Sequence, residues 1–238
     1  MDGKSQRSRD GESSYYAAKL SAERLVRVYE VAPKRVQQYL QGEIDEVIRH
    51  ISSESVVLEL GCGYGRVMKE VAERAKLVVG IDSAAGSLKY GKEFLSHSAS
   101  CLLAGMDVLS LGFRDNCFDL VYAIQNGISA FHVEPGNLVE EALRVTRPGG
   151  KVLLSTYSSK FWNHRLEWFY RQSEAGLLGE IDLEETGNGV IVTEDGFTGT
   201  AFPPERLQAI LNGMNLEFEL REVDESSLFC EIVKKSRS

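Results

Sequence analysis

The sequence predicts an α/β fold built on a mostly parallel β-sheet with helices on both faces. From residue 55 to residue 157, short apolar runs alternate with stretches of helical periodicity. This alternation is typical of parallel strands joined by helices. The sheet that such strands form is buried on both faces. Two further apolar runs, at residues 216–223 and 228–234, are separated by a short polar stretch and predict a closing antiparallel hairpin.

The elements of this fold can be placed in order along the chain. The first five strands are expected at residues 55–60, 77–81, 100–103, 118–124 and 151–157. Helices are expected at residues 66–74, 85–96, 136–146 and 203–212. Residues 147–150, Arg-Pro-Gly-Gly, are expected to form a turn before the fifth strand.

Residues 15–51 are expected to form an N-terminal helical cap. Apolar residues recur there at three- and four-residue steps, which predicts two helices. Ser21 is placed to cap the first helix, and Pro33 suits the first turn of the second. Residues 1–14 are polar and are expected to be a disordered tail, so a single domain is expected over residues 15–238.

An inserted lid is expected after the fifth strand, at residues 158–202. The alternation breaks there into an aromatic-rich helical stretch and three short runs with glycine-containing turns. These runs, at residues 180–185, 189–193 and 196–202, predict small strands.

The composition argues against several function classes. The chain has 238 residues and a formal net charge of −8, which disfavours a nonspecific binder of nucleic acid or anionic membranes. Its four cysteines and four histidines show no metal-ligand spacing, so reduced thiols and no metal site are expected. No apolar run approaches the roughly 18 residues of a membrane span, and the N-terminus lacks a signal peptide's apolar core. We therefore expect a cytoplasmic protein without a membrane span.

The most informative stretch is a glycine-rich turn after the first strand. Residues 56–66 read Val-Val-Leu-Glu-Leu-Gly-Cys-Gly-Tyr-Gly-Arg. The glycines let the backbone turn sharply and approach a ligand closely. A dinucleotide site favours Gly-x-Gly-x-x-Gly around a diphosphate, whereas Arg66 replaces the last glycine here and Glu59 would repel a diphosphate. Glu59 suits a cationic ligand, and an ordinary tight turn is the alternative.

A second polar position follows the second strand. Asp82 lies nineteen positions after Gly63, where a carboxylate can accept both ribose hydroxyls of an adenosine. Capping of the next helix by Asp82 and Ser83 is the alternative. With the glycine turn, this pattern resembles the class I S-adenosylmethionine (SAM)-dependent methyltransferases. The resemblance covers residues 55–157 and the final hairpin, and implies a Rossmann-like seven-stranded, mostly parallel sheet.

The resemblance implies a row of cofactor contacts along the strand ends. Met106 and Asp107, after the third strand, would face the adenine. Gln125 and Asn126, after the fourth, would lie beside the methionine part of SAM or beside the acceptor. One tyrosine before the cap, Tyr16 or its neighbour, would close over SAM. The expected cofactor-binding set is Tyr16, Glu59, Gly61, Cys62, Gly63, Asp82, Ser83, Met106, Asp107, Val108, Gln125 and Asn126.

The reaction implied is in-line transfer of the SAM methyl group to an acceptor, which leaves S-adenosylhomocysteine. The sulfonium already activates the methyl group, so the protein must mainly hold nucleophile, carbon and sulfur collinear and dry. A base matters only where the acceptor must lose a proton. His132 and His164 are the candidate bases, and a surface or structural role is the alternative for each.

Missing motifs narrow the acceptor to a small molecule. The residues after the fourth strand, Gln125-Asn126-Gly127, are not the Pro-Pro-aromatic motif of enzymes that methylate DNA amino groups. Residues 157–159 supply no acidic ligand of the kind that catechol-type enzymes use for their metal. The cysteines are not gathered as in the arsenite-methylating group.

The lid offers one further clue to the acceptor. No Lys or Arg occurs between Arg171 and Arg206, a span rich in Asp and Glu. An acidic pocket mouth would attract a cationic or amine acceptor, and a solvated acidic surface is the alternative. Trp162 and Trp168 would stack on a substrate or cage a cation, or would pack inside the lid.

Two other functions are compatible with the motifs. A SAM-binding but catalytically silent partner or regulatory protein would carry the same cofactor residues. A nicotinamide-dependent reductase is the other, and the absent third glycine and Asp107 argue against it.

Overall fold

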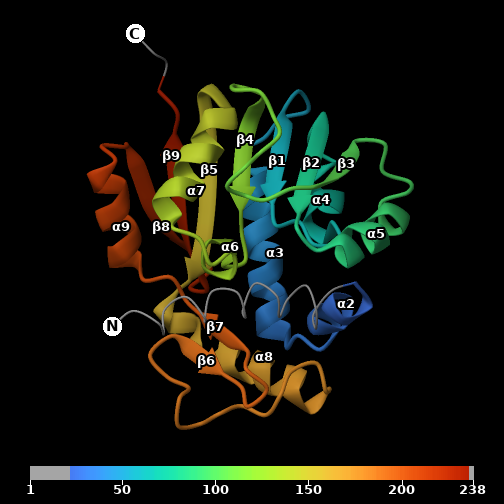
Figure 1. Cartoon of the computed structure of the whole chain (residues 1–238), viewed down its shortest axis with the longest axis vertical. Helices are drawn as coiled ribbons and strands as arrows, with labels where there is room; N and C mark the ends of the chain where they lie inside the picture. Colours follow the sequence, from blue (N-terminus) through green and yellow to red (C-terminus); the bar gives the residue numbers. More distant parts are fainter. Residues whose placement is uncertain (1–21, 236–238) are drawn as a thin grey trace.

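A seven-stranded sheet forms the centre of the molecule (Figure 1). The computed structural model describes residues 22–235, so the expected tail, Ser21 and Tyr16 lie outside the described residues. The strands are β1 (Val56–Leu60), β2 (Leu77–Asp82), β3 (Cys101–Gly105), β4 (Phe118–Ala123), β5 (Thr146–Tyr157), β8 (Phe218–Val223) and β9 (Ser227–Val233). Their order is β3-β2-β1-β4-β5-β9-β8. Strands β1 to β5 pair in parallel and β9 pairs antiparallel with both neighbours, which confirms the predicted sheet and hairpin.

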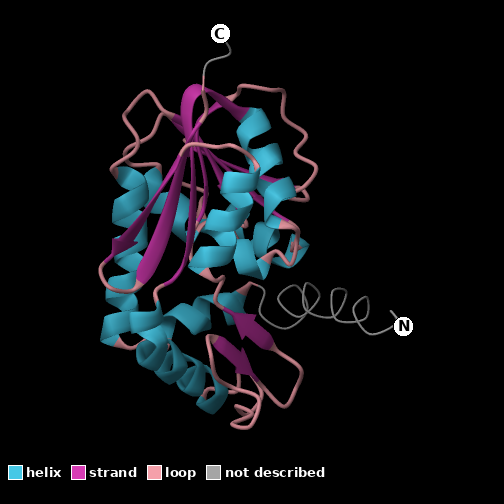
Figure 2. Ribbon diagram, turned by 90° about the vertical axis from the view of Figure 1, so that its left-hand side faces the viewer, coloured by secondary structure: helices cyan, strands magenta, loops and turns pink. Residues whose placement is uncertain are grey.

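Helices cover both faces of this sheet, as the edge-on view of Figure 2 shows. They are α2 (Glu23–Glu30), α3 (Lys34–Ile48), α4 (Arg66–Val71), α5 (Ala85–Phe94), α6 (Gly127–Ala130), α7 (Pro135–Val145), α8 (Trp162–Glu174) and α9 (Pro204–Gly213). Helices α7 and α9 contribute to one apolar core and α3 and α4 to the core of the opposite face. The central strands are apolar on both sides because each of these cores takes alternate residues, Leu58 in one and Val57 in the other.

Helix α3 belongs to two cores at once. Its second half buries Ile44 and Val47 in the core of the sheet. Its first half packs with the segment after β5, where the ring centroid of Tyr39 lies 4.9 Å from that of Phe161 and 5.4 Å from that of Tyr157. The apolar stripe read from the sequence therefore joins the sheet to the inserted segment.

The segment after β5 consists of a 3-10 turn η1 (Ser159–Phe161), α8 and a small hairpin, β6 (Val190–Val192) and β7 (Thr198–Thr200). It packs its own apolar core against α2 and α3. The strand predicted at residues 180–185 is wrong, because only Ile181 forms a bridge, to Thr193. The chain turns there instead, since the Asp182 carboxylate accepts the backbone N–H groups of Glu184 and Glu185.

Strand β5 begins earlier than predicted. The turn expected at residues 147–150 lies inside the strand, which starts at Thr146 opposite Phe118. The register shifts between Phe118 and Leu120, so an irregular stretch carries the proline and glycines. Backbone hydrogen bonds between Lys234 and residues 149–150 hold this stretch in the sheet.

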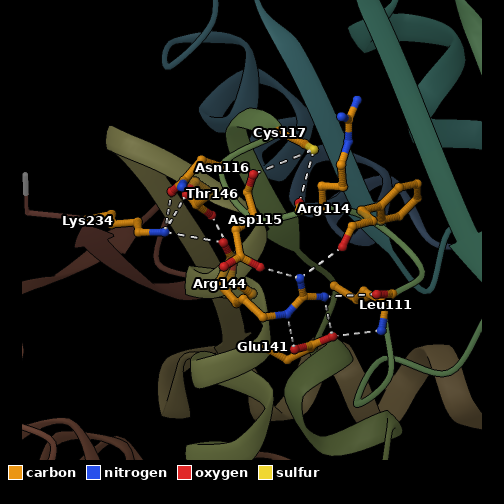
Figure 3. Close-up of polar contacts among 11 residues, drawn as sticks. Leu111, Arg114, Asp115, Asn116, Cys117, Glu141, Arg144, Thr146 and Lys234 are labelled. Carbon is orange, nitrogen blue, oxygen red and sulfur yellow. Dashed lines mark hydrogen bonds and ion pairs between the residues drawn. The ribbon is translucent and has the colours of Figure 1, made fainter.

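A network around Arg144 fixes the long loop between β3 and β4 (Figure 3). The Arg144 guanidinium donates to the carbonyl oxygens of Leu111 and Phe113, each at 2.9 Å. It also pairs with the carboxylates of Asp115 and Glu141. The loop begins with the residues expected to face adenine, so this network restrains the chain that carries them.

Candidate functional site

The carboxyl ends of the parallel strands face the inserted segment. Helix α6, which follows β4, and α8, which follows β5, lie at the lower end of the sheet in Figure 1, beside β6 and β7. In open α/β sheets ligands bind at this edge, near the point where the strand order reverses. Here the order reverses between β1 and β4, so the candidate site lies where the chain leaves these two strands.

The turn after β1 needs its glycines. Gly61, Gly63 and Gly65 have φ values of +73°, +55° and +87°, in the left-handed region that favours glycine. A Cβ on Gly61 would lie 2.6 Å from the ring of Phe131, and one on Gly63 would lie 3.0 Å from Leu25. The glycine positions therefore leave the loop backbone without side chains. Leu25 of α2 and Phe131 after α6 approach this backbone from two sides.

Asp82 braces this loop from the end of β2. One carboxylate oxygen accepts the Gly63 N–H at 2.8 Å, and the other accepts the Ala84 N–H at 2.7 Å. The second bond does not cap α5, because Ala84 is the N-cap residue of that helix and no side chain caps it. Ser83 is exposed. Each oxygen keeps a further lone pair, so these bonds are compatible with a ribose between them.

Glu59 is a buried acid at the end of β1. Its side chain is 5% exposed and accepts the Tyr122 hydroxyl proton at 2.9 Å. Burial, with a smaller contribution from the charge of Asp82, raises the pKa of Glu59 to about 8, although the Tyr122 hydrogen bond and the charge of Arg66 oppose this shift. A positively charged ligand at the loop would stabilise the ionised form and lower this pKa again.

Arg66 is a site residue that sequence reasoning used only as a missing glycine. Its guanidinium lies 4.4 Å from the ring centroid of Tyr29 in α2. Its Nε and Nη2 atoms are buried and make no hydrogen bond within the described residues. The signal in the sequence was the residue itself, a cation at the first position of the helix after the glycines.

Gln125 lies opposite Arg66, in the turn after β4. The Tyr29 hydroxyl donates to Gln125 Oε1 at 3.3 Å, while Gln125 Nε2 is buried and makes no hydrogen bond in the described part of the chain. Gln125 and Asn126 have φ values of +56° and +63°, an uncommon pair of left-handed residues other than glycine. Such conformations persist only where the surroundings hold them.

Both polar atoms of the Asn126 side-chain amide form hydrogen bonds. Its Nδ2 donates to the Thr200 carbonyl of β7 at 2.8 Å, and its Oδ1 accepts from the Thr156 hydroxyl at 3.0 Å. These bonds tie the end of β4 to β5 and the small hairpin. In this arrangement the Asn126 side chain supports the site and has no free amide group pointing to a ligand.

Glu43 of α3 is the second site residue that the sequence did not indicate. It is 1% exposed and accepts hydrogen bonds from the backbone N–H of Gln125 and from the hydroxyl of Ser227. Burial raises the pKa of Glu43 to about 7, although both bonds oppose this shift. The signal was faint, a single acid within an otherwise apolar helical stripe.

The other expected cofactor residues lie around the loop in different environments. Cys62 is buried beneath it against Gly80, and its backbone N–H and carbonyl bond to Ile81 and Gly65. Asp107 is exposed and accepts the Leu109 N–H at 2.8 Å, and Met106 and Val108 are half-buried beside it. Asp119, at the start of β4, accepts the Val56 N–H and pairs with Arg147.

The two candidate bases are not brought together. His132 follows Phe131 with a φ of +53° and is half-buried near the glycine loop. His164 is exposed on α8, with its ring 5.7 Å from that of Phe161. Trp168 is buried, and its Nε1–H donates to the Val28 carbonyl at 2.9 Å, which makes it a packing residue between α8 and α2.

Among residues 22–235, no three or more His, Cys, Asp and Glu side chains are grouped so as to hold a metal ion. Within the same range, no helix combines the length and the apolar character that crossing a bilayer requires.

Comparison with known proteins gives matches over the glycine loop and the strands that follow it. Residues 58–154 match a family model described as a methyltransferase domain. A sterol 4-C-methyltransferase of Caenorhabditis elegans is 29% identical over 52% of this chain and 39% of its own length. A demethylmenaquinone methyltransferase of Paenarthrobacter aurescens is 37% identical over 43% of this chain and 38% of its own. A 2-methyl-6-phytyl-1,4-hydroquinone methyltransferase of Synechocystis is 25% identical over 76% and 64%.

Solved structures share the fold at low sequence identity. A protein from Pyrococcus horikoshii aligns over 93% of this chain and 98% of its own, with a TM-score of 0.66 and 18% identity. A SAM-dependent methyltransferase from Aquifex aeolicus covers 79% and 88%, with a TM-score of 0.56 and 13% identity. The [4+2]-cyclase SpnF covers 82% and 81%, with a TM-score of 0.57 and 16% identity.

The chain has a Rossmann-like α/β fold with a glycine loop at the strand ends. This fold and the match over residues 58–154 make the chain similar to the class I SAM-dependent methyltransferases, whose cofactor is S-adenosylmethionine. The matched segments span about two fifths of the length of the first two relatives.

Proposed function

We propose that this chain transfers the methyl group of SAM to a small organic acceptor by in-line displacement. The observation that carries the proposal is a carboxyl group and a guanidinium beside the glycine loop. Glu59 is buried, and Arg66 is half-buried with its Nε and Nη2 atoms buried. The methionyl end of SAM carries groups that suit them, a sulfonium and an ammonium for the carboxyl group and a carboxylate for the guanidinium.

The residues present fit that cofactor. Arg66 Nε and Nη2 and Gln125 Nε2 are buried donors that need acceptors, and a carboxylate supplies two acceptor oxygens. Glu59 would face the positive groups, and Asp82 would accept the ribose hydroxyls. Met106 and Asp107 would take the adenine, as the family resemblance implies.

The chemistry of SAM, when it is bound, is a methyl group already activated by its sulfonium. The protein would hold the two reactants in line and exclude water, effects worth roughly 7–11 kcal/mol in well-oriented systems. In this chain α2 and Phe131 lie over the glycine loop and would serve that purpose. His132 is the candidate base nearer the loop, for an acceptor that must lose a proton.

We propose an acceptor that is largely apolar rather than cationic. The relatives are named for sterol, menaquinone and phytyl-hydroquinone methylation. The carboxylates of Glu184, Glu185 and Glu194 in the acidic segment are exposed to solvent, which supports the solvated-surface alternative for that segment. An amine acceptor, expected from the charge pattern, is the competing outcome of the acceptor test.

Binding of S-adenosylhomocysteine by isothermal titration tests the cofactor half. We expect Arg66→Gln to weaken binding at least tenfold, because the carboxylate loses its charged partner. Arg74→Gln is the matched control, since Arg74 is exposed at the end of the same segment. Asp82→Ala should also weaken binding severely. Equal affinities for the Arg66 and Arg74 variants would show that the carboxylate does not bind at Arg66.

Turnover of methyl-labelled SAM with a panel of hydroquinones, sterols and amines tests the acceptor half. Label on a hydroquinone or sterol supports the proposal, and label only on an amine supports the cationic acceptor. A SAM-binding protein without methyl transfer is the second candidate, since this fold also occurs in a chain described as a [4+2]-cyclase. Tight binding with no labelled product from any acceptor class would favour it.

A further inference from the structure

A buried carboxylate joins the N-terminal helix α3 to the strand ends at the site. The Oε2 atom of Glu43 accepts the backbone N–H of Gln125, with N and O 2.5 Å apart. Its Oε1 atom accepts the Ser227 hydroxyl at 2.6 Å. The two donors belong to the turn after β4 and to the start of β9, so one side chain holds three segments that are distant in sequence.

The turn that Glu43 holds has an unfavourable backbone conformation. Gln125 and Asn126 both have left-handed backbone conformations, which are unfavourable for residues other than glycine. The Gln125 N–H is directed at Glu43 and would lose this acceptor without it. On the other side of the turn, Asn126 is fixed by Thr156 and Thr200.

The conformation of this turn decides where the Gln125 amide lies. With the backbone held by Glu43, Gln125 Oε1 receives the hydroxyl of Tyr29, and Tyr29 in turn lies under the guanidinium of Arg66. Gln125 Nε2, which has no hydrogen-bond partner among residues 22–235, is thereby kept among the donors proposed for the cofactor carboxylate.

We propose that Glu43 is a positioning residue for cofactor binding, which acts by holding the Gln125–Asn126 turn so that the Gln125 amide meets the methionyl end of SAM. The proposal rests on the proposed function, because it takes SAM as the ligand of the glycine loop. Glu43 would make no contact with the cofactor itself, because it acts through its hydrogen bond to the Gln125 backbone.

A second buried acid of α3, Glu46, provides a matched control. If Glu43 only stabilised the fold, replacing Glu46 would have the same effect as replacing Glu43. Glu46 is also 1% exposed, but its carboxylate pairs with Arg221, Arg49 and His50 on the outer side of α3. Replacing either acid by leucine removes a buried hydrogen-bonded carboxylate from α3. Only one of the two replacements releases the turn after β4.

The experiment compares Glu43→Leu, Glu43→Gln and Glu46→Leu by thermal unfolding and by titration with S-adenosylhomocysteine. We expect both leucine variants to unfold at lower temperature, and only Glu43→Leu to raise the Kd, by about tenfold or more. Glu43→Gln should retain affinity within about threefold, because its amide can still accept from Gln125 and donate to Ser227. The proposal is overturned if the two leucine variants bind alike.

A double-mutant cycle with Gln125→Ala separates action through Gln125 from a general loss of structure. We expect Glu43→Leu to raise the Kd at least tenfold in the parent chain and less than threefold in the Gln125→Ala chain. Equal effects in both chains would also overturn the proposal. Should Glu43→Leu not fold, Glu43→Asp, which withdraws the carboxylate by one methylene, takes its place in the cycle with the same expectation. If the parent chain itself fails to bind S-adenosylhomocysteine, the proposed function is what fails.

Discussion

At the scale of single residues, Glu59 combines two properties that oppose each other in the absence of a ligand. Its carboxyl group lies where it would stabilise a cationic ligand. The same group is buried so deeply that its ionised form is disfavoured. With a pKa of about 8, Glu59 carries a proton in much of the ligand-free protein at neutral pH.

Binding of SAM should therefore release protons. The sulfonium and ammonium groups favour ionised Glu59 and lower its pKa, so we expect affinity for SAM to rise as the pH increases from about 6 to 8. Calorimetric titrations at pH 7 in buffers of different ionisation enthalpy measure the release directly. Glu59→Gln should reduce it. Binding enthalpies that are the same in every buffer for the parent chain would contradict this assignment.

The residues that the sequence identified are those whose role is local. Gly61 and Gly63 are recognisable because a turn between a strand and a helix demands them, and Asp82 because it ends the next strand. Arg66 and Glu43 were missed for the opposite reason. Their importance comes from burial and from distant partners, Tyr29 for Arg66 and Ser227 for Glu43, 37 and 184 positions away respectively, which no local pattern records.

At the scale of elements, Arg165 of α8 is the main link between that helix and the small hairpin. It is 1% exposed, and its guanidinium donates to the carbonyl oxygens of Gly189 at 2.8 Å and Gly199 at 2.7 Å. The same group lies 4.5 Å from the ring centroid of Tyr157. A buried cation that binds the backbone just before β6 and in the middle of β7 fixes the hairpin without relying on its loop sequence.

Replacing Arg165 by methionine should loosen the hairpin. The change leaves two carbonyl groups without their charged donor, which we expect to cost about 2–5 kcal/mol of unfolding free energy. Hydrogen–deuterium exchange should become faster at residues 190–200. Arg171→Met, which removes an exposed arginine paired with Glu167 on the same helix, is the control. Unchanged exchange in the Arg165 variant would show that the hairpin is held by its apolar contacts.

Elements with a strong repeating pattern were predicted well, and those held by single side chains were not. The strands of the sheet follow from buried apolar runs, and α3 from its stripe. The run at residues 180–185 looked like a strand, but Asp182 turns the chain there through its side chain. The start of β5 was placed too late because its proline and glycines suggest a turn, while pairing with β4 and bonds from Lys234 keep it extended.

At the scale of the whole molecule, two buried acids make stability depend on pH. Burial raises the pKa of Glu43 to about 7 and that of Glu59 to about 8, from an ordinary value of 4.5. The folded state therefore binds protons more tightly than the unfolded state at these groups. Their contribution to stability is fully present below pH 4.5 and is lost as the pH rises to about 8.

We expect the unfolding free energy of the ligand-free protein to fall between pH 5.5 and pH 8. At 1.36 kcal/mol for each pKa unit between pH 5.5 and the raised pKa, Glu43 contributes at most about 2 kcal/mol and Glu59 at most about 3 kcal/mol of this change. Urea denaturation at the two pH values measures it, and Glu59→Gln should flatten the dependence. A protein equally stable at both pH values would contradict the placement of these carboxyl groups.

The contact between Glu43 and Gln125 also bears on how chains of this kind can diverge. The segment shared with the methyltransferase family model, residues 58–154, contains Gln125 but neither α3 nor Ser227. A chimera that joined this common segment to an N-terminal helix from another lineage would set an unmatched side chain against the turn after β4. Recombination between relatives should therefore give a functional protein only where α3 and that turn come from the same parent. Glu43 and Gln125 would then be inherited as one unit, although they are 82 positions apart.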